Sequence, residues 1–173
     1  MKDIQERAKK IKLLLLDVDG VLTDGRIIIG NYGDEIKNFD VRDGLGIMML
    51  KKAGIKCAII TAKSSRIVSI RAKQLGIDRI YENHYKIKPL KEIKKRFRVN
   101  DDEICFAGDD LVDIPVLKRV GLAVTVPNAS EEAKEAAHYL TQKKGGRGAV
   151  REICDIILKA QGKWDVVTRR YFE

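Results

Sequence analysis

Residues 12–24 read KLLLLDVDGVLTD, four consecutive leucines that lead directly into two aspartates two positions apart. A short run this apolar is typical of a strand that is covered by helices on both faces. Strands of that kind belong to parallel sheets, which bind ligands at the carboxyl ends of their strands. The stretch therefore predicts an α/β protein in which Asp17 and Asp19 lie at the ligand-binding edge of the sheet.

The rest of the chain repeats this alternation of apolar runs and helix-period segments. We predict strands over residues 55–60, 79–81, 103–107 and 122–126, and helices over residues 44–53, 65–75, 87–98, 111–119, 130–137 and 150–161. Ser64 or Ser65 is a candidate cap for the second of these helices. Residues 27–29 and 36–39 flank the turn-forming sequence GNYGD and predict a β-hairpin. The alternation predicts one domain over residues 1–173, with a mostly parallel central sheet between two layers of helices.

Composition and charge exclude several classes of protein. The 173 residues include 34 Lys plus Arg and 25 Asp plus Glu, a net charge of +9, and 45% are apolar, which is ordinary for a globular domain. No apolar run approaches the roughly 20 residues of a membrane helix, and charges interrupt any signal-peptide core. The odd number of cysteines, all in or beside apolar runs, is typical of buried thiols in a reducing compartment, so we expect a cytoplasmic protein. With only two histidines, a histidine-based triad or a multi-histidine metal site is close to excluded.

The basic excess is concentrated in residues 86–98, where seven lysines and arginines face a single glutamate. On a helix, Leu90, Ile93 and Phe97 form an apolar stripe and the cations lie around the solvated side. Such a face attracts polyanions, but neither interleaved aromatic residues nor a binding motif accompanies it. We therefore expect neither a nucleic-acid partner nor a membrane partner.

Polar residues follow four of the predicted strands. The first strand ends in Asp17 and Asp19, the second in Thr61, the third leads to Lys86, and the fourth leads through Gly108 to Asp109. Because parallel strands end at one edge of a sheet, we expect these carboxylates, the hydroxyl and the ammonium to meet there.

Carboxylates that are brought together repel one another, and a hard divalent cation such as Mg²⁺ resolves that repulsion. Mg²⁺ shares its coordination shell with phosphate oxygens, and the neighbouring hydroxyl and ammonium suit the remaining phosphoryl oxygens. One carboxylate can then attack phosphorus to form an aspartyl-phosphate. A second, two residues on, can protonate the leaving oxygen and later activate water. The pattern predicts magnesium-assisted phosphoryl transfer through a covalent aspartate.

The sequence LLDVDGVLTD at residues 15–24, with the three later strand ends in order after it, resembles the four motifs of the haloacid-dehalogenase-like (HAD) phosphatases. The resemblance implies a three-layer Rossmann-like fold with a hairpin flap. It makes Asp17 the nucleophile and Asp19 the general acid/base, and assigns Thr61 and Lys86 to the phosphoryl group. Mg²⁺ would be held by Asp17, Asp109 and the backbone carbonyl of Asp19.

Two further stretches, FDVRDGLGI at residues 39–47 and GGRGAVRE at residues 145–152, look like the 3-deoxy-D-manno-octulosonate 8-phosphate phosphatase branch of that superfamily. Enzymes of this branch release phosphate and free 3-deoxy-D-manno-octulosonate, a lipopolysaccharide precursor. The resemblance implies that substrate contacts come from nine residues. They are Asp19, Asp40, Val41, Arg42, Asp43, Gly44, Lys63, Arg71 and Lys86.

Several alternatives stay open at this point. Lys88 competes with Lys86, although the spacing of the family favours Lys86. Asp110 either caps the following helix or contacts the metal, and Asp113 lies either on the surface or against the site. Arg147 is either a mobile surface residue or a substrate contact.

The resemblance also bears on assembly and on the substrate. The stretches from Asp19 to Thr61 and from Thr61 to Lys86 leave no room for a cap domain that would exclude water. We therefore expect a neighbouring subunit to complete the site, in a homotetramer by resemblance. Its hairpins would pair, and the loop 145–148 or the tail would reach an active site.

Two alternative functions remain. One is a phosphatase for another acidic sugar phosphate, such as an N-acylneuraminate 9-phosphate, and the other is a catalytically silent HAD-like binding module.

Overall fold

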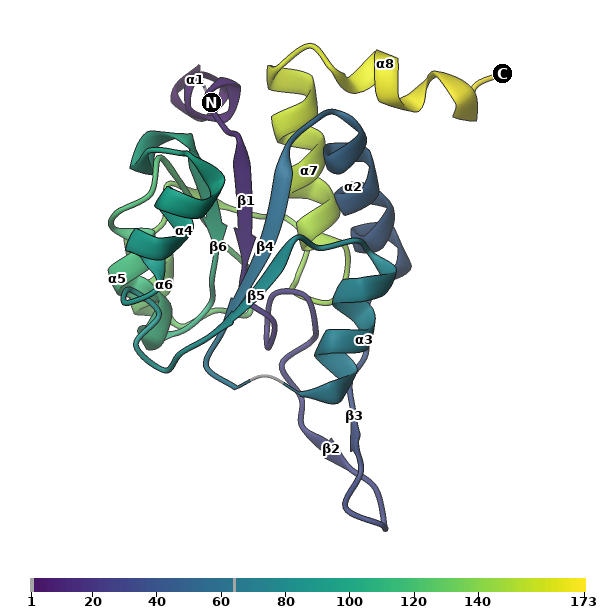
Figure 1. Cartoon of the computed structure of the whole chain (residues 1–173), viewed down its shortest axis with the longest axis vertical. Helices are drawn as coiled ribbons and strands as arrows, with labels where there is room; N and C mark the ends of the chain where they lie inside the picture. The colour runs from purple at the N-terminus through teal and green to yellow at the C-terminus, as the bar shows by residue number, and fades with distance from the viewer. Residues whose placement is uncertain (1, 64) are drawn as a thin grey trace.

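The computed structural model describes residues 2–63 and 65–173 and has at its centre a six-stranded sheet (Figure 1). The strand order is β5-β4-β1-β6-β7-β8, and every neighbouring pair is parallel. The strands are β1 (Leu13–Leu16), β4 (Lys56–Thr61), β5 (Arg79–Glu82), β6 (Ile104–Ala107), β7 (Leu122–Thr125) and β8 (Tyr139–Leu140). The predicted α/β class with a mostly parallel sheet is confirmed.

Helices cover both faces of the sheet. The α-helices are α1 (Lys2–Lys9), α2 (Val41–Lys52), α3 (Arg66–Gln74), α4 (Leu90–Phe97), α5 (Ile114–Leu117), α6 (Glu131–Ala136), α7 (Ala149–Ala160) and α8 (Trp164–Thr168). Short 3₁₀ helices are η1 (Asp101–Glu103), η2 (Leu111–Asp113) and η3 (Arg169–Tyr171). In Figure 1, α4, α5 and α6 lie on one side of the sheet and α2, α3 and α7 on the other.

The leucines of β1 divide between two apolar cores, one on each face. Leu14 and Leu16 pack with residues of α2, α3 and α7, whereas Leu13 and Leu15 pack with residues of α4, α5 and α6. All four side chains are fully buried, each stabilising the fold by about 1.5–3 kcal/mol through removal of apolar surface from water. The run of leucines thus fixes β1 in the middle of three layers and holds Asp17 at its end.

Side-chain caps set where two of the helices begin. Ser65 accepts a hydrogen bond from the Val68 amide at the start of α3, and Ser130 accepts one from the Ala133 amide at the start of α6. Of the two candidate caps for α3, Ser64 lies outside the described residues. The chain leaves α3 through Gly76, whose φ of +63° is accessible to glycine at little cost.

Three predicted helix boundaries shift for identifiable reasons. Helix α2 begins at Val41, three residues before the predicted start, because Asp40 caps it through the Arg42 amide. Helix α4 begins only at Leu90, after Pro89. The predicted helix 111–119 divides into η2 and α5, with Pro115 in the first turn of α5. The terminal helices α1 and α8 and the two-residue strand β8 are additions that the sequence patterns did not indicate.

The predicted hairpin forms a separate two-stranded antiparallel sheet, β2 (Ile28–Ile29) and β3 (Glu35–Ile36). It projects from the end of the molecule opposite both chain termini (Figure 1). Between Asp19 and Thr61 the chain forms only this hairpin, α2 and β4, and the described residues between Thr61 and Lys86 form only α3 and β5. No helix in the described residues combines the length and the apolar character needed to cross a bilayer.

Candidate active site

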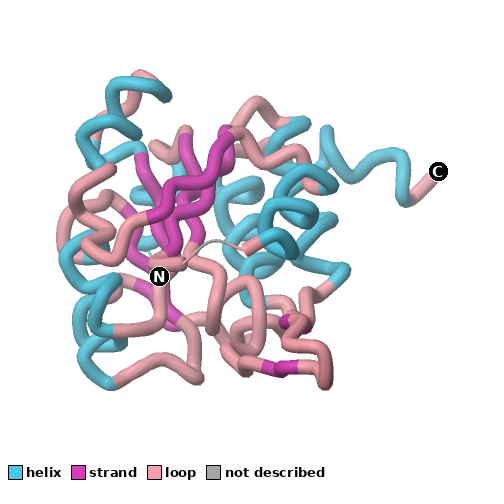
Figure 2. Tube along the Cα trace, turned by 60° about the horizontal axis from the view of Figure 1, so that its bottom comes forward, coloured by secondary structure: helices cyan, strands magenta, loops and turns pink. Residues whose placement is uncertain are grey.

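The candidate site lies where the strands of the main sheet end, on the side that comes forward in Figure 2. Asp17 directly follows β1, Thr61 is the last residue of β4, and Asp109 follows β6 after one glycine. Lys86 lies in the connection between β5 and α4. The structure thus brings four elements that are distant in sequence to one edge of the sheet, as the sequence predicts.

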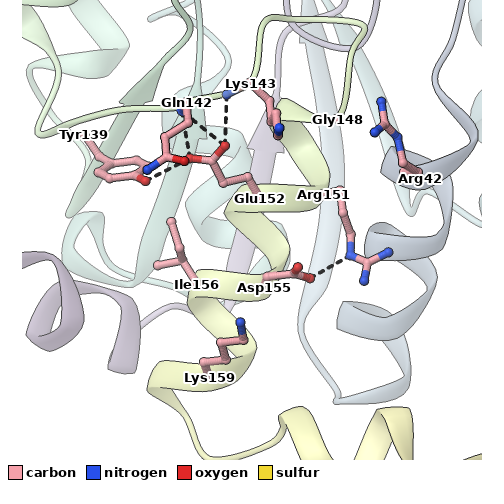
Figure 3. Close-up of a pocket in the computed structure, with 10 residues that line it drawn as sticks. All are labelled: Arg42, Tyr139, Gln142, Lys143, Gly148, Arg151, Glu152, Asp155, Ile156 and Lys159. Atoms are coloured by element: carbon pink, nitrogen blue, oxygen red, sulfur yellow. Dashed lines mark hydrogen bonds and ion pairs between the residues drawn. The ribbon is translucent and has the colours of Figure 1, made fainter. Parts of the chain in front are cut away.

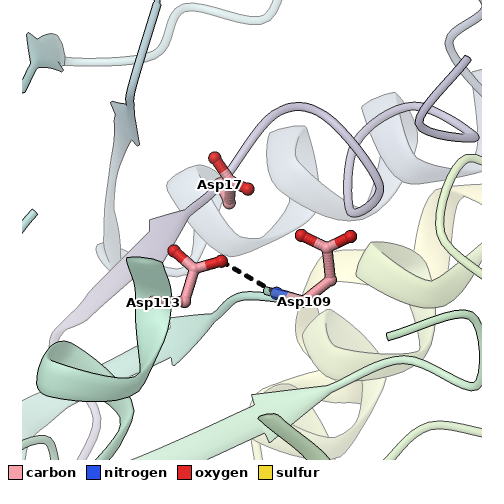
Figure 4. A group of neighbouring side chains, drawn as sticks. All are labelled: Asp17, Asp109 and Asp113. Carbon is pink, nitrogen blue, oxygen red and sulfur yellow. Dashed lines mark hydrogen bonds between the residues drawn. The ribbon is translucent and has the colours of Figure 1, made fainter. Parts of the chain in front are cut away.

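Three carboxylates meet at this edge. One oxygen each from Asp17, Asp109 and Asp113 lies within 4.8 Å of the others, and the three side chains converge (Figure 4). Asp17 is 5% exposed and Asp113 is fully buried. The sequence left open whether Asp113 lies on the surface or against the site. The structure places it in the site.

Lys86 joins two of these carboxylates. Its Nζ lies 2.7 Å from Asp17 Oδ1 and donates to Asp113 Oδ1 at 2.6 Å, and its side chain is 1% exposed. Lys88 is exposed, and its ammonium lies 4.8 Å from the centre of the Tyr85 ring. Of the two competing lysines, the structure places Lys86 in the carboxylate cluster.

The cluster is short of positive charge. Burial, followed by the charge of Asp113, raises the pKa of Asp17 well above its ordinary value, and the same two causes raise the pKa of Asp109 to about 7. Burial disfavours the Lys86 ammonium, but Asp17 and Asp113 still raise its pKa. Two buried carboxylates and the half-buried carboxylate of Asp109, beside one ammonium, form a set of oxygen donors that suits a hard divalent cation.

Asp113 differs from the other two carboxylates because its oxygens already have donors. Oδ1 accepts from Lys86, and Oδ2 accepts from the backbone amides of Asp109 at 2.9 Å and Asp110 at 3.2 Å. Asp110 caps η2, its side chain accepting from the Leu111 amide at 2.7 Å. Asp113 therefore orients Lys86 and the loop after β6, which leaves Asp17 and Asp109 as the better placed metal ligands.

The loop after Asp17 passes very close to Asp109. At Gly20, where φ is +88°, a Cβ would lie 1.8 Å from Asp109 Oδ2, so only glycine fits. Asn128, which follows β7, donates from Nδ2 to the Gly20 carbonyl at 3.0 Å and accepts from the Gly145 amide at 2.8 Å. Asn128 thereby ties the loop 145–148 to the loop that carries Asp19.

Asp19 and Thr61 occupy the periphery of the cluster. The Asp19 carboxylate is 45% exposed and contacts Lys37 Nζ at 2.5 Å, so its side chain faces the hairpin. Thr61 is buried, and its hydroxyl donates to the Lys63 carbonyl at 3.1 Å. The contact predicted between the Asp19 carbonyl and a metal stays a prediction.

Comparison with known proteins identifies the family. Residues 77–153 match the haloacid dehalogenase-like hydrolases. The chain is 44% identical over 167 residues to the Yersinia pestis protein named 3-deoxy-D-manno-octulosonate 8-phosphate phosphatase KdsC, covering 96% of this chain and 89% of that one. The Escherichia coli K12 protein of the same name is 43% identical over 94% of this chain and 87% of its own length. The chain belongs to the 3-deoxy-D-manno-octulosonate 8-phosphate phosphatase family. It is therefore a HAD-like phosphatase.

Solved structures of similar proteins agree with the fold. A Moraxella catarrhalis phosphatase of this name, solved with a magnesium ion, a phosphate ion and 3-deoxy-D-manno-octulosonate (KDO), is 42% identical, with a TM-score of 0.96 over 99% of both chains. A HAD-superfamily hydrolase from Legionella pneumophila is 46% identical, also with a TM-score of 0.96, over 99% of this chain and 95% of that one. The predicted HAD fold is confirmed.

The residues that the resemblance assigns to substrate divide into two groups in the structure. The first group lies beside Asp19 and includes Lys63, which lines a cavity together with Asp19. The second group is the segment 40–44, which contacts the start of α7. Asp40 caps α2, and Val41 is 80% exposed. Their roles toward substrate stay predictions.

Arg42 and Arg71 also make contacts within the chain. Arg42 pairs with Asp40 at 2.6 Å and donates to the Arg147 carbonyl at 3.0 Å. It also lines a pocket that otherwise consists of residues of α7 and of the segment before it (Figure 3). The Arg71 guanidinium lies over the Phe39 ring, and a Cβ at Gly44 would come within 2.8 Å of Arg71 Nη2. Gly44 thus leaves room for the Arg71 guanidinium beside α2.

Sequence reasoning missed Lys37 and Asn128. Asn128 follows a predicted strand, which is the signal that pointed to the other site residues, and could have been found in the same way. Lys37 lies in the predicted hairpin strand 36–39, away from any strand of the main sheet, and no pattern in the sequence connects it to Asp19.

The carboxylate of Asp43 predicts a specific pH dependence of stability. It accepts from the Arg151 amide at 2.7 Å, its other oxygen is buried without a partner, and burial is the main cause that raises its pKa to about 6. The folded state therefore keeps a proton that the unfolded state loses near pH 4, so this contribution to stability falls as pH rises from about 4 to 6. In the wild type, Asp43 alone is expected to make the unfolding free energy about 2 kcal/mol lower at pH 7.5 than at pH 4.5. The variant Asp43→Asn lacks this group, so its change in unfolding free energy between the two pH values is expected to differ from that of the wild type by this amount.

Urea unfolding of both proteins at the two pH values measures this difference. Asp102→Asn, which alters an exposed carboxylate, is the matched control and is expected to keep the wild-type difference. An Asp43→Asn protein with the wild-type difference would show that Asp43 is ionised in the folded state across this range.

Proposed function

We propose that this protein is a magnesium-dependent phosphatase that hydrolyses 3-deoxy-D-manno-octulosonate 8-phosphate to 3-deoxy-D-manno-octulosonate and phosphate. The observation that carries the proposal is the cluster of Asp17, Asp109 and Asp113, in which the buried Lys86 pairs with Asp17 and Asp113. It occurs in a chain that is 42% identical to a phosphatase solved with magnesium, phosphate and KDO. The product would supply lipopolysaccharide synthesis in the cytoplasm, a location that fits three buried, unpaired cysteines.

Asp17, Asp109 and the Asp19 carbonyl would hold the magnesium ion. The donor set fits, because oxygens of Asp17 and Asp109 lie within 4.8 Å of one another and a bound cation would offset the burial and the Asp113 charge that raise the pKa of both groups. When bound, the ion neutralises charge on the phosphoryl oxygens and orients the group toward the nucleophile.

The residues of the chain then carry out two displacements. Asp17 attacks phosphorus, the bond from phosphorus to the sugar oxygen breaks, and Asp19 gives that oxygen a proton. Asp19 next takes a proton from water, which attacks the aspartyl-phosphate and releases phosphate. Thr61 and Lys86 bind the phosphoryl oxygens and stabilise charge in both transition states. Lys63, Arg71 and the segment 40–44 would contact the acidic sugar.

We also propose that residues 1–173 act as one domain in a homotetramer, in which a neighbouring subunit completes the site. The hairpin supports this, because it exposes five large apolar side chains: Ile27, Ile28, Ile29, Tyr32 and Ile36. Contiguous exposed apolar surface of this kind marks an interaction site. Sedimentation velocity at micromolar protein is expected to show a tetramer, and a single monomeric species would contradict the assembly.

Removal of the metal tests the chemistry. EDTA is expected to abolish phosphate release from 3-deoxy-D-manno-octulosonate 8-phosphate, and added MgCl₂ is expected to restore it. Asp109→Asn is expected to raise the Mg²⁺ concentration for half-maximal activity at least about tenfold, since loss of even an indirect partner weakens metal sites by that factor. Asp102→Asn serves as the control. Full activity in EDTA would contradict the proposal.

A further inference from the structure

Lys37, the residue directly after β3, is buried in a hairpin that otherwise exposes its apolar side chains. Its side chain is 3% exposed, although the residue as a whole is partly buried, whereas Ile27 and Ile29 of the same hairpin are 73% and 70% exposed as whole residues. Lysine is almost never buried without a partner. The arrangement reverses the usual distribution of apolar and charged residues, so it calls for a reason other than hydrophobic packing.

The partners of Lys37 are two carboxylates. Its Nζ lies 2.5 Å from Asp19 Oδ1 and 2.9 Å from Glu35 Oε1. The Asp19 and Glu35 side chains are 45% and 31% exposed, and ion pairs with a partner open to solvent contribute about 1 kcal/mol or less. Stability therefore does not explain the contact, and the identity of the partner becomes informative: Asp19 is the group to which we assign proton transfer.

Asp19 and Lys37 both line a cavity of about 300 Å³ between the hairpin and the loop after β4. Glu35, Lys63 and Ser65 form other parts of its wall. Its volume is within the range of small-ligand pockets. A leaving oxygen that takes a proton from Asp19 has to lie within hydrogen-bond distance of that carboxylate, so the sugar would extend into this cavity.

We propose that Lys37 is a positioning residue for Asp19. Its ammonium binds Oδ1 of Asp19 and holds the carboxyl group toward the cavity. In the protonated acid the other oxygen carries the proton and gives it to the leaving sugar oxygen as the bond to phosphorus breaks, which leaves the Asp19 carboxylate paired with Lys37; Lys37 keeps its own protons throughout. This inference rests on the proposed function, in which Asp19 is the general acid/base. It also makes Glu35 and Lys37, and with them the hairpin, part of the active site.

The test compares two leaving groups. The sugar oxygen of 3-deoxy-D-manno-octulosonate 8-phosphate needs a proton to leave, whereas 4-nitrophenyl phosphate releases a stable phenolate. Lys37→Met is expected to lower kcat for the sugar phosphate at least about 30-fold, within the range that general acid catalysis contributes. The loss with 4-nitrophenyl phosphate is expected to be at least tenfold smaller. Lys37→Arg keeps a cation that can pair with Asp19 and is expected to restore most of the lost kcat.

Lys56→Met removes an exposed lysine from the other end of the sheet and is the matched control. Equal losses with both substrates would make Lys37 a purely structural residue and overturn the inference. An unchanged kcat, or an effect confined to KM, would also overturn it. A wild type that does not hydrolyse the octulosonate ester overturns the proposed function alone, and the same comparison with the alkyl phosphate that it prefers still decides the role of Lys37.

Discussion

The variant Asp17→Asn is expected to release phosphate at least about 10⁴-fold more slowly than the wild type, because an amide cannot form the aspartyl-phosphate. The fold should persist. Lys86 keeps its contact with Asp113, and asparagine fills nearly the same volume at the end of β1. Burial and the charge of Asp113 already raise the pKa of Asp17, so the neutral amide relieves repulsion in the metal-free protein.

Two measurements on this variant separate loss of chemistry from loss of structure. Rapid acid quench after mixing with labelled substrate is expected to trap phosphorylated protein from the wild type and none from Asp17→Asn. Urea unfolding is expected to show a variant that is at least as stable as the wild type without metal. Asp102→Asn controls for removal of a carboxylate elsewhere. Phosphate release at the wild-type rate would refute covalent catalysis by Asp17.

The second large effect is expected for Lys86→Met. This change leaves Asp17 and Asp113 buried without their shared cation, and breaking a buried ion pair in this way costs about 3–5 kcal/mol. Activity is expected to fall by about 10²–10³-fold, because a charged donor to the phosphoryl group is lost. Mg²⁺ supplies compensating charge to the cluster and is expected to stabilise the variant more than it stabilises the wild type.

Urea unfolding with and without MgCl₂ measures both effects, and Lys88→Met is the matched control. Lys88 is exposed and only two positions away, so its loss is expected to leave stability and metal response close to the wild type. A larger effect from Lys88→Met than from Lys86→Met would reverse the assignment of the two lysines.

Most of the site could be predicted because its functional residues lie at or just after the ends of apolar strands. Leu13–Leu16, Ile104–Ala107 and their parallel neighbours read as buried runs, and in a parallel sheet all of them deliver their next residues to one edge. The position of Asp17, Thr61 and Asp109 was thus fixed by local sequence together with one topological rule.

The remaining features depend on tertiary contacts that leave no local pattern. Asp43 is buried because the start of α7 packs on it, and its carboxylate accepts from the Arg151 amide 108 positions away. Lys37 is buried because the hairpin folds against Asp19. Strand β8 has only two residues and lies at the edge of the sheet, too short for a period to be recognised.

The most direct test of the whole account is a comparison of kcat/KM for phosphate release in Mg²⁺ from 3-deoxy-D-manno-octulosonate 8-phosphate, an N-acylneuraminate 9-phosphate and common hexose phosphates. We expect the octulosonate ester to have the highest value and to be preferred over the hexose phosphates by at least about 100-fold, because these lack the carboxylate and leave polar groups of the site unpaired. Similar values for all substrates would keep the phosphatase chemistry and contradict the assigned substrate. Release from none of them would contradict catalysis altogether and favour a silent binding module.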